Sequence, residues 1–100
     1  MTNGQTQTYE IRMDTQIGPR FGRLTVLTRV EKLSGYLDIL RHTEPFEGTI
    51  DGNGNCEFAG KIVTLIRTVS YIATGTITPD ALCLSLTGDK SIFKITGTAR

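Results

Sequence analysis

Hydrophobic and polar residues alternate with a period of two along most of the chain, and no segment shows the period of 3.6 that predicts an amphipathic helix. In residues 9–13, for example, the apolar side chains share one face and the charged side chains share the other. Breaks rich in Gly, Pro, Asn and Asp recur roughly every 12 residues, which is typical of a β-sandwich or a barrel. The pattern predicts about eight strands. They cover residues 7–13, 20–30, 33–41, 46–51, 55–66, 69–78, 82–87 and 91–98.

Short breaks join these strands, so we expect sequence neighbours to pair antiparallel as a meander. An open sheet of this size would leave exposed edges and a bare apolar face, and closure removes both problems. The sequence therefore predicts an all-β fold with one domain over residues 1–100, an antiparallel up-and-down meander closed into a small barrel. Residues 1–6 are interpreted as a flexible lead-in. A two-sheet β-sandwich is the alternative.

A recurring phrase of apolar residue, any residue, Gly, any residue, apolar residue places glycines inside the predicted strands. It is clearest in residues 46–50, Phe-Glu-Gly-Thr-Ile. The glycines that fall within strands on the inward face are Gly22, Gly35, Gly48, Gly60, Gly75 and Gly97. Barrels need such positions, because an inward glycine lets a strand coil and lets the opposite wall approach. We interpret the glycines as structural, and space for a ligand is the less favoured interpretation.

Composition argues against two classes of partner. Lys+Arg 11 against Asp+Glu 10 gives a formal net charge of +1, whereas a nucleic-acid-binding protein normally carries a basic excess. No apolar run approaches the roughly 18 residues of a membrane span. Residues 1–8 are polar and lack the hydrophobic region of a signal peptide. We therefore expect a cytoplasmic protein with neither a nucleic-acid partner nor a membrane partner.

Motifs for catalysis or metal binding are missing. Cys56 and Cys83 fit no metal-ligand spacing, and we expect free thiols. Residues 51–55, Asp-Gly-Asn-Gly-Asn, begin like a calcium loop, but Cys56 stands where that loop needs Gly and Ile62 where it needs Glu. The serines lie in no nucleophile elbow. We expect no metal and no cofactor, we assign no catalytic residue, and an enzyme is the least favoured class.

A meander sorts its turns between two ends of the barrel. One end, named here the His42 end, collects the breaks at residues 14–19, 42–45, 67–68 and 88–90. The other end, named the Asp51 end, collects those at residues 31–32, 52–54 and 79–80 with both termini. The His42 end has the longest loop and the single histidine, and ligands often enter barrels at a mouth. We predict a ligand site there. Its polar contacts would come from Arg20, Arg41, His42 and Arg67, its inner lining from Met13 and Tyr71, and its rim from Phe21.

Two functions stay open at this point. The first is a binding module that takes a small anionic or amphipathic ligand at the His42 end. The alternative is a non-enzymatic interaction or structural protein with a filled core, which acts through its outer surface or as a homodimer. Apolar residues in the outward phase favour the alternative: Leu27, Tyr36, Val63, Leu65, Ile72 and Ile92. Interior volume separates the two, since eight strands leave little space beyond side chains.

Two stretches are similar to known sequences. The first is Ile17–Val26, IGPRFGRLTV, and the second begins at His42–Asp51, HTEPFEGTID, and continues through Leu65–Tyr71, LIRTVSY. Together they resemble a group of small bacterial β-barrel proteins of no assigned function. The resemblance implies a stand-alone β domain and supplies no catalytic residues. The interior alternation also resembles calycin barrels (lipocalin, fatty-acid-binding and streptavidin-like proteins), in architecture only, because none of their diagnostic motifs is present.

Overall fold

The structure, a computed structural model, describes residues 5–64, 66–88 and 90–100. Three parts of the predictions lie outside the described residues: residues 1–4 of the lead-in, Leu65 of the outward apolar set and Asp89 of the last turn. The described chain forms eight strands and no helix. They are β1 (Gln5–Thr15), β2 (Gly18–Arg29), β3 (Lys32–Ile39), β4 (His42–Ile50), β5 (Asn55–Val63), β6 (Thr68–Ile77), β7 (Ala81–Gly88) and β8 (Ser91–Ala99).

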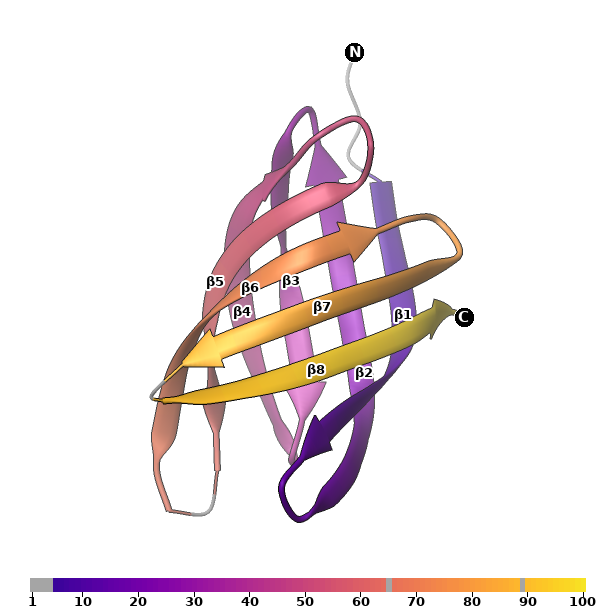
Figure 1. Ribbon diagram of the computed structural model, residues 1–100. Helices are drawn as coiled ribbons and strands as arrows, with labels where there is room; N and C mark the ends of the chain where they lie inside the picture. The colour runs from indigo at the N-terminus through magenta and orange to yellow at the C-terminus, as the bar shows by residue number, and fades with distance from the viewer. Residues whose placement is uncertain (1–4, 65, 89) are drawn as a thin grey trace.

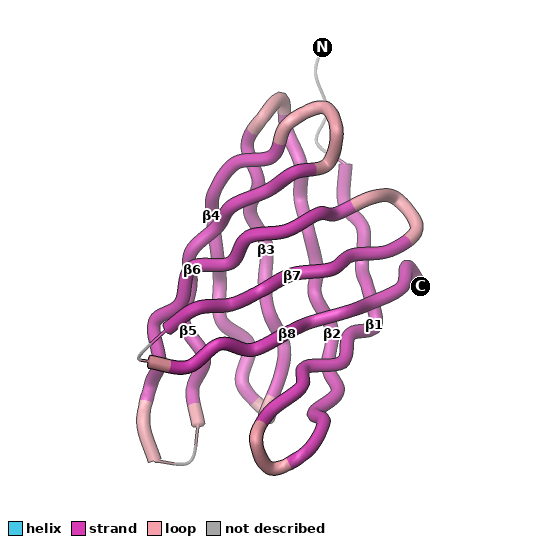
Figure 2. Tube along the Cα trace, in the orientation of Figure 1, coloured by secondary structure: helices cyan, strands magenta, loops and turns pink. Residues whose placement is uncertain are grey.

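Each strand pairs antiparallel with the next, and β8 returns to β1, so the sheet is a closed barrel. The closing ladder runs from Tyr9 opposite Ala99 to Asp14 opposite Lys94. Figure 1 shows β6, β7 and β8 crossing obliquely in front of β2 and β3. Figure 2 shows that only short turns interrupt the strands. The predicted up-and-down barrel is confirmed, and the chain does not adopt the two-sheet alternative.

Side chains from every strand fill the interior. Inward residues of all eight strands form one buried apolar cluster, and none of the described polar or charged residues is buried with them. The rings of Phe46 and Phe58 lie 4.3 Å apart between centroids, and Tyr71 meets Phe58 edge-on at 6.2 Å. An eight-stranded barrel is just wide enough for its own side chains, so this core is a packed one.

The strand glycines lie on the inward face, as the alternation predicts. Gly48 is opposite Leu33 on one side and Phe58 on the other, and both partners are core residues. A Cβ atom added at Gly48 would overlap the carbonyl oxygen of Glu57 and lie 2.6 Å from the Cβ atom of Phe58. The glycine therefore allows β5 to approach β4 closely, which supports the structural interpretation.

Two hairpin turns differ from their predicted positions. The β2–β3 turn is Val30–Glu31, where residues 31–32 were predicted, and the β3–β4 turn is Leu40–Arg41, where strand was predicted. All four residues have positive φ, from 44° to 67°. Positive φ at both central positions is the type I′ geometry that matches the strand twist, and it usually carries Asn-Gly. These turns lack the usual residues, so their sequences did not reveal them.

Several strand ends also differ from their predicted positions. β4 begins at His42, so the predicted break at residues 42–45 is wrong. Pro45 is accommodated because the β4–β5 ladder ends at Phe46 and Gly60, so Pro45 has no β5 partner to which it would donate. β5 ends at Val63, before the predicted residue 66. β1 begins at Gln5, so residues 5 and 6 belong to a strand and are not lead-in.

Candidate functional site

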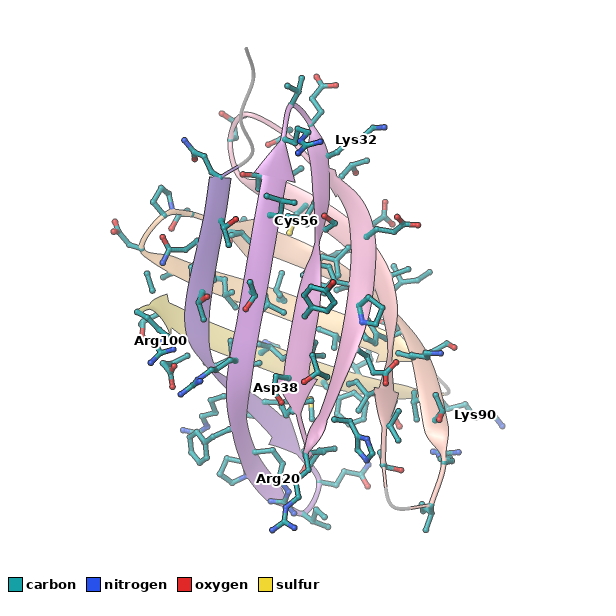
Figure 3. All side chains as sticks on the ribbon, turned by 180° about the vertical axis from the view of Figure 1, so that it is seen from behind. Arg20, Lys32, Asp38, Cys56, Lys90 and Arg100 are labelled. Atoms are coloured by element: carbon teal, nitrogen blue, oxygen red, sulfur yellow. The ribbon has the colours of Figure 1, made fainter. Side chains whose placement is uncertain are left out.

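The turns sort between two ends as predicted. The His42 end carries the β1–β2, β3–β4, β5–β6 and β7–β8 connections, and the Asp51 end carries the other three together with the described chain ends. In Figure 1 the β1–β2 and β5–β6 hairpins extend furthest at the lower end of the barrel. Figure 3, seen from behind, places Arg20 at this end and Lys32 at the opposite end.

The hairpins separate from one another as they approach the His42 end. The β2–β3 ladder ends at Arg23 opposite Asp38, so residues 18–22 of β2 have no β3 partner. The β4–β5 ladder likewise ends before residues 42–45 of β4 find a partner on β5. Glu44 spans the second opening, since its Oε1 atom lies 4.0 Å from Nζ of Lys61. The His42 end is thus built from hairpins with openings between them.

An open groove of about 600 Å³ lies where β2 leaves β3, and we name it the Phe21 groove. Outward side chains from β1, β2, β3 and β8 line it, with core residues Ile11 and Ile39 at its floor. The lining side chains relevant to binding are Arg12, Phe21, Arg23, Asp38, Leu40 and Arg41. Phe21 is 72 % exposed, so a large aromatic face stands in solvent among guanidinium groups.

Most of the charges in the groove are already paired. Glu10 Oε2 accepts contacts from Nε of Arg23 at 3.2 Å and from Nε of Arg100 at 3.0 Å. Nε of Arg12 donates to Oδ1 of Asp14 at 2.9 Å. Arg41 is exposed and has no ion pair or side-chain hydrogen bond with any described residue. Arg41 is therefore the guanidinium of the groove that can take an anion without giving up an existing partner.

The structure divides the predicted site residues into three sets. Phe21 and Arg41 come together in the groove. Arg20, His42 and Arg67 lie at the same end on three different hairpins; His42 and Arg67 are exposed, and Arg20 is half-buried with Nη1 donating to the Pro19 carbonyl at 2.9 Å. Met13 and Tyr71, 2 % and 3 % exposed, are core residues and line no opening in this structure.

Tyr71 carries the one buried side-chain polar atom without a hydrogen-bond partner among the described residues. Burial raises the pKa of this phenol well above its usual range. Its hydroxyl stands over Gly60, where an added Cβ atom would lie 2.7 Å from it. Tyr71 lines none of the four pockets described for this structure.

Several groove residues were missing from the sequence-based site: Arg12, Arg23, Asp38 and Leu40. A signal for the first two was present, because Arg12 is opposite Phe21 in the β1–β2 hairpin and Arg23 follows in the same outward phase. No signal existed for Asp38 and Leu40. Their approach depends on where β2 leaves β3, which is a property of the assembled barrel.

A second pocket, of about 610 Å³, lies at the Asp51 end among Tyr9, Ile50, Ile77 and the turns around them. Its polar groups are committed to the fold. The Tyr9 hydroxyl donates to the Thr78 carbonyl at 2.5 Å, and Oδ1 of Asp51 accepts the N–H groups of Asn53 and Asn55 at 2.8 and 3.0 Å. Burial, and then the charge of Asp80, raises the pKa of Tyr9. The Phe21 groove is therefore the stronger candidate site.

Three further searches gave negative results. No group of three or more His, Cys, Asp or Glu side chains in the described ranges is placed to hold a metal ion. The described residues contain no helix long and apolar enough to cross a membrane. Comparison with protein-family models, curated proteins and solved structures found no match. The resemblance to small bacterial barrels stays a prediction.

Proposed function

We propose that this protein is a non-enzymatic binding module that takes a small anionic amphiphile in the Phe21 groove beside the His42 end. The observation that carries the proposal is the pairing of an exposed aromatic face, Phe21, with the unpaired guanidinium of Arg41 in one groove. The aromatic ring would cover the apolar part of the ligand, and the planar fork of Arg41 would hold its anionic group.

The charge distribution supports an anionic ligand. Counted by strand halves and turns, the described cations toward the His42 end are Arg12, Arg20, Arg23, Arg41, Lys61, Arg67, Lys90 and Lys94, against Asp14, Asp38 and Glu44. Toward the Asp51 end the acids Glu31, Glu47, Asp51, Glu57 and Asp80 outnumber Arg29, Lys32 and Arg100. Glu10 lies at the midpoint of β1, and the acid Asp89 lies outside the described residues. The near-neutral chain therefore folds into a barrel with one cationic end, whose field attracts anions.

Because the interior is filled, the ligand that we propose would bind on the wall of the barrel. Because Met13 and Tyr71 are packed in the core, they would not contact a ligand in the groove. An exposed ion pair is worth at most about 1 kcal/mol, so the apolar contact must supply most of the affinity. We expect weak binding, on the order of 0.1–1 mM.

The test is a titration of isotopically labelled protein with octyl phosphate below its micelle concentration, followed by amide chemical shifts. Shifts should concentrate at residues 20–23 and 38–41, and inorganic phosphate should give smaller shifts at the same places. Arg41→Glu should weaken binding of octyl phosphate at least about fivefold, since it replaces an attraction by a repulsion of similar size.

Arg29→Glu is the matched control, because Arg29 is an exposed arginine near the Asp51 end and makes the same change in net charge. It should leave binding unchanged. Octyltrimethylammonium, with the same tail and the opposite charge, should not bind. The proposal is wrong if both variants lose the same affinity for octyl phosphate, or if the amide chemical-shift changes centre on residues 51–54.

A specific observation keeps the homodimer alternative in view. Ile72 and Ile92 are 54 % and 69 % exposed, and both flank Thr87 on the outer face of β6, β7 and β8. Tyr36 belongs to the opposite wall, beside Thr25 and Pro45, so the predicted outward set does not form one patch. Light scattering on wild type and Ile92→Lys tests this alternative: a dimer that the substitution dissociates supports it, and a monomeric wild type removes it.

A further inference from the structure

Large apolar side chains project from the turns of the His42 end. Ile17 in the β1–β2 turn is 81 % exposed, and Ile66 in the β5–β6 turn is 89 % exposed. Phe21, at 72 %, stands on the outer side of the first hairpin. Exposed apolar residues are common singly, but side chains of this size at the tips of separate hairpins at one end need a reason.

The two isoleucines cannot serve one small ligand. They belong to different hairpins, which the β3–β4 and β7–β8 hairpins separate around the barrel. Figures 1 and 2 show both hairpins reaching the lower end of the barrel with their turns apart. Neither isoleucine lines any of the four described pockets. An extended surface can contact both tips at once, which a small molecule cannot do.

The cationic residues near Ile17 and Ile66 indicate which kind of surface the two turns would contact. Arg20 is three residues from Ile17, Arg67 is next to Ile66, and Arg41 lies in the turn between the two hairpins in chain order. Apolar tips surrounded by cations match an anionic lipid bilayer, whose headgroups attract Arg and Lys and whose interior accepts Ile and Phe.

We propose that the barrel docks on an anionic lipid surface by its His42 end, with Ile17 and Ile66 entering the interface and a lipid headgroup at Arg41. This inference rests on the function proposed above and names its ligand. The sequence led us to expect no membrane partner, because it contains no spanning segment. Docking by two turns needs no span, and only the folded hairpins bring the two isoleucines to one end.

The chain contains no tryptophan, so a single introduced tryptophan reports its own surroundings. Ile17→Trp and Ile66→Trp would each be mixed with vesicles of phosphatidylcholine alone or with phosphatidylserine added. Emission should shift to shorter wavelength only with phosphatidylserine. Val30→Trp is the matched control, since Val30 is an apolar turn residue, 71 % exposed, at the Asp51 end. Its emission should not change.

Binding strength would be measured by sedimentation with the same vesicles. Ile17→Asp with Ile66→Asp should reduce partitioning into phosphatidylserine vesicles at least about tenfold, since two apolar contacts are lost and two repulsive charges are gained. Val30→Asp should have no effect. Raising the salt concentration should also release the wild-type protein, because the attraction of cations to the surface is screened.

The outcomes separate this inference from the proposed function. If the protein binds octyl phosphate but not vesicles, the proposed docking on a lipid surface is wrong and the proposed ligand site in the Phe21 groove is retained. Vesicle binding that Ile17→Asp with Ile66→Asp leaves intact would overturn insertion of the tips. A change in the oligomeric state of that double variant would show that the tips contact a second copy of the chain instead. If the wild-type protein binds neither octyl phosphate nor vesicles, both proposals are wrong.

Discussion

The two ends of the barrel are closed by different means. At the Asp51 end, backbone hydrogen bonds outside the strand ladders tie each turn to a neighbouring strand. The N–H of Ile50 donates to the Glu31 carbonyl at 3.0 Å, that of Ile77 to Gly54 at 2.9 Å, and that of Ala99 to Asp80 at 2.8 Å. These bonds link one hairpin to the next, so the turns of this end form a continuous rim.

The His42 end has no such rim among the described residues. Its one described backbone bond outside the ladders stays within a turn, from the N–H of Thr64 to the Arg67 carbonyl at 2.8 Å. The Thr15 hydroxyl likewise donates within its own hairpin, to the Gly18 carbonyl at 2.6 Å. These described backbone and hydroxyl bonds stay within single hairpins, and the Glu44–Lys61 ion pair is a described contact between two hairpins of this end.

The difference agrees with the proposal that the Asp51 end stabilises the fold and the His42 end binds a partner. Bonds between hairpins stabilise the Asp51 end and use its polar backbone groups. The separated hairpins of the His42 end leave a groove, cations and apolar tips available for contact with a partner. Surfaces that bind partners often belong to the less stable part of a fold, and this division is consistent with that tendency.

The largest expected effect on stability comes from replacing inward glycines in the two halves of the barrel. Gly48→Val should destabilise the fold by about 3 kcal/mol or prevent folding, because its Cβ atom would overlap the Glu57 carbonyl and the Phe58 backbone, which cannot move aside. Gly60→Val, nearer the His42 end, should cost less, since the nearest atoms to its Cβ belong to the side chains of Tyr71 and Phe46.

Urea unfolding monitored by circular dichroism measures both losses. Thr49→Val is the control for Gly48→Val, because Thr49 is exposed on the same strand and either residue suits a strand. A free energy of unfolding of Gly48→Val equal to that of wild type would overturn the close approach of β4 and β5.

The next effect is a gain in stability from the type I′ turns. Val30→Asn with Glu31→Gly should stabilise the protein by about 1–2 kcal/mol, since both residues have positive φ that Asn and Gly adopt at lower cost. Leu40→Asn with Arg41→Gly should give a smaller gain, because Leu40 packs against the core, and it should also weaken octyl phosphate binding. Binding that survives the second pair of substitutions would show that Arg41 has no part in the site.

The sequence predicts those features of the fold and the site that depend on the local pattern of side chains and turns. The alternation of side chains and the short breaks were sufficient for a closed meander, since closure follows from edges that must be satisfied. The inward phase of Gly48 followed from the same alternation. The sorting of turns between two ends followed from strand parity, which one misplaced boundary does not alter.

The features that the sequence did not predict have a common physical cause. The turns at Val30–Glu31 and Leu40–Arg41 lack Asn-Gly, so tertiary pairing imposes a backbone that local preference disfavours. The groove depends on the point at which β2 leaves β3 after Arg23. Met13 and Tyr71 were assigned to a mouth because their phase is inward, but phase does not give depth. The chain does not encode depth locally, because the stagger of the assembled barrel sets it.

A smaller effect should appear in native-state hydrogen exchange. The amides of Ile50, Ile77 and Ala99 should exchange at least about tenfold more slowly than that of Thr64, because their bonds break only when neighbouring hairpins separate. Exchange followed by NMR near neutral pH gives these rates residue by residue. Equal protection of these four amides would show that the two ends are equally stable.

The smallest effect concerns the Asp51 carboxylate, which is fully exposed. Hydrogen bonds lower its pKa below the usual 3.8, first from the N–H of Asn53 and then from the side chain and N–H of Asn55. The carboxylate therefore favours the folded state above that usual value, and its contribution disappears as pH falls through the lower pKa of the folded protein.

Asp51→Asn should consequently be slightly less stable than wild type at pH 7, with a difference that shrinks below pH 3.8 as the wild-type carboxyl takes up its proton. Urea unfolding at a series of pH values measures this difference. Glu57→Gln is the control, because it makes the same change in net charge at an exposed residue without a described side-chain hydrogen bond. A constant gap between wild type and Asp51→Asn down to pH 2 would mean that the charge does not hold the turn. The Asp51 end would then depend on its backbone bonds alone, and its contrast with the His42 end would involve no side chain of this turn.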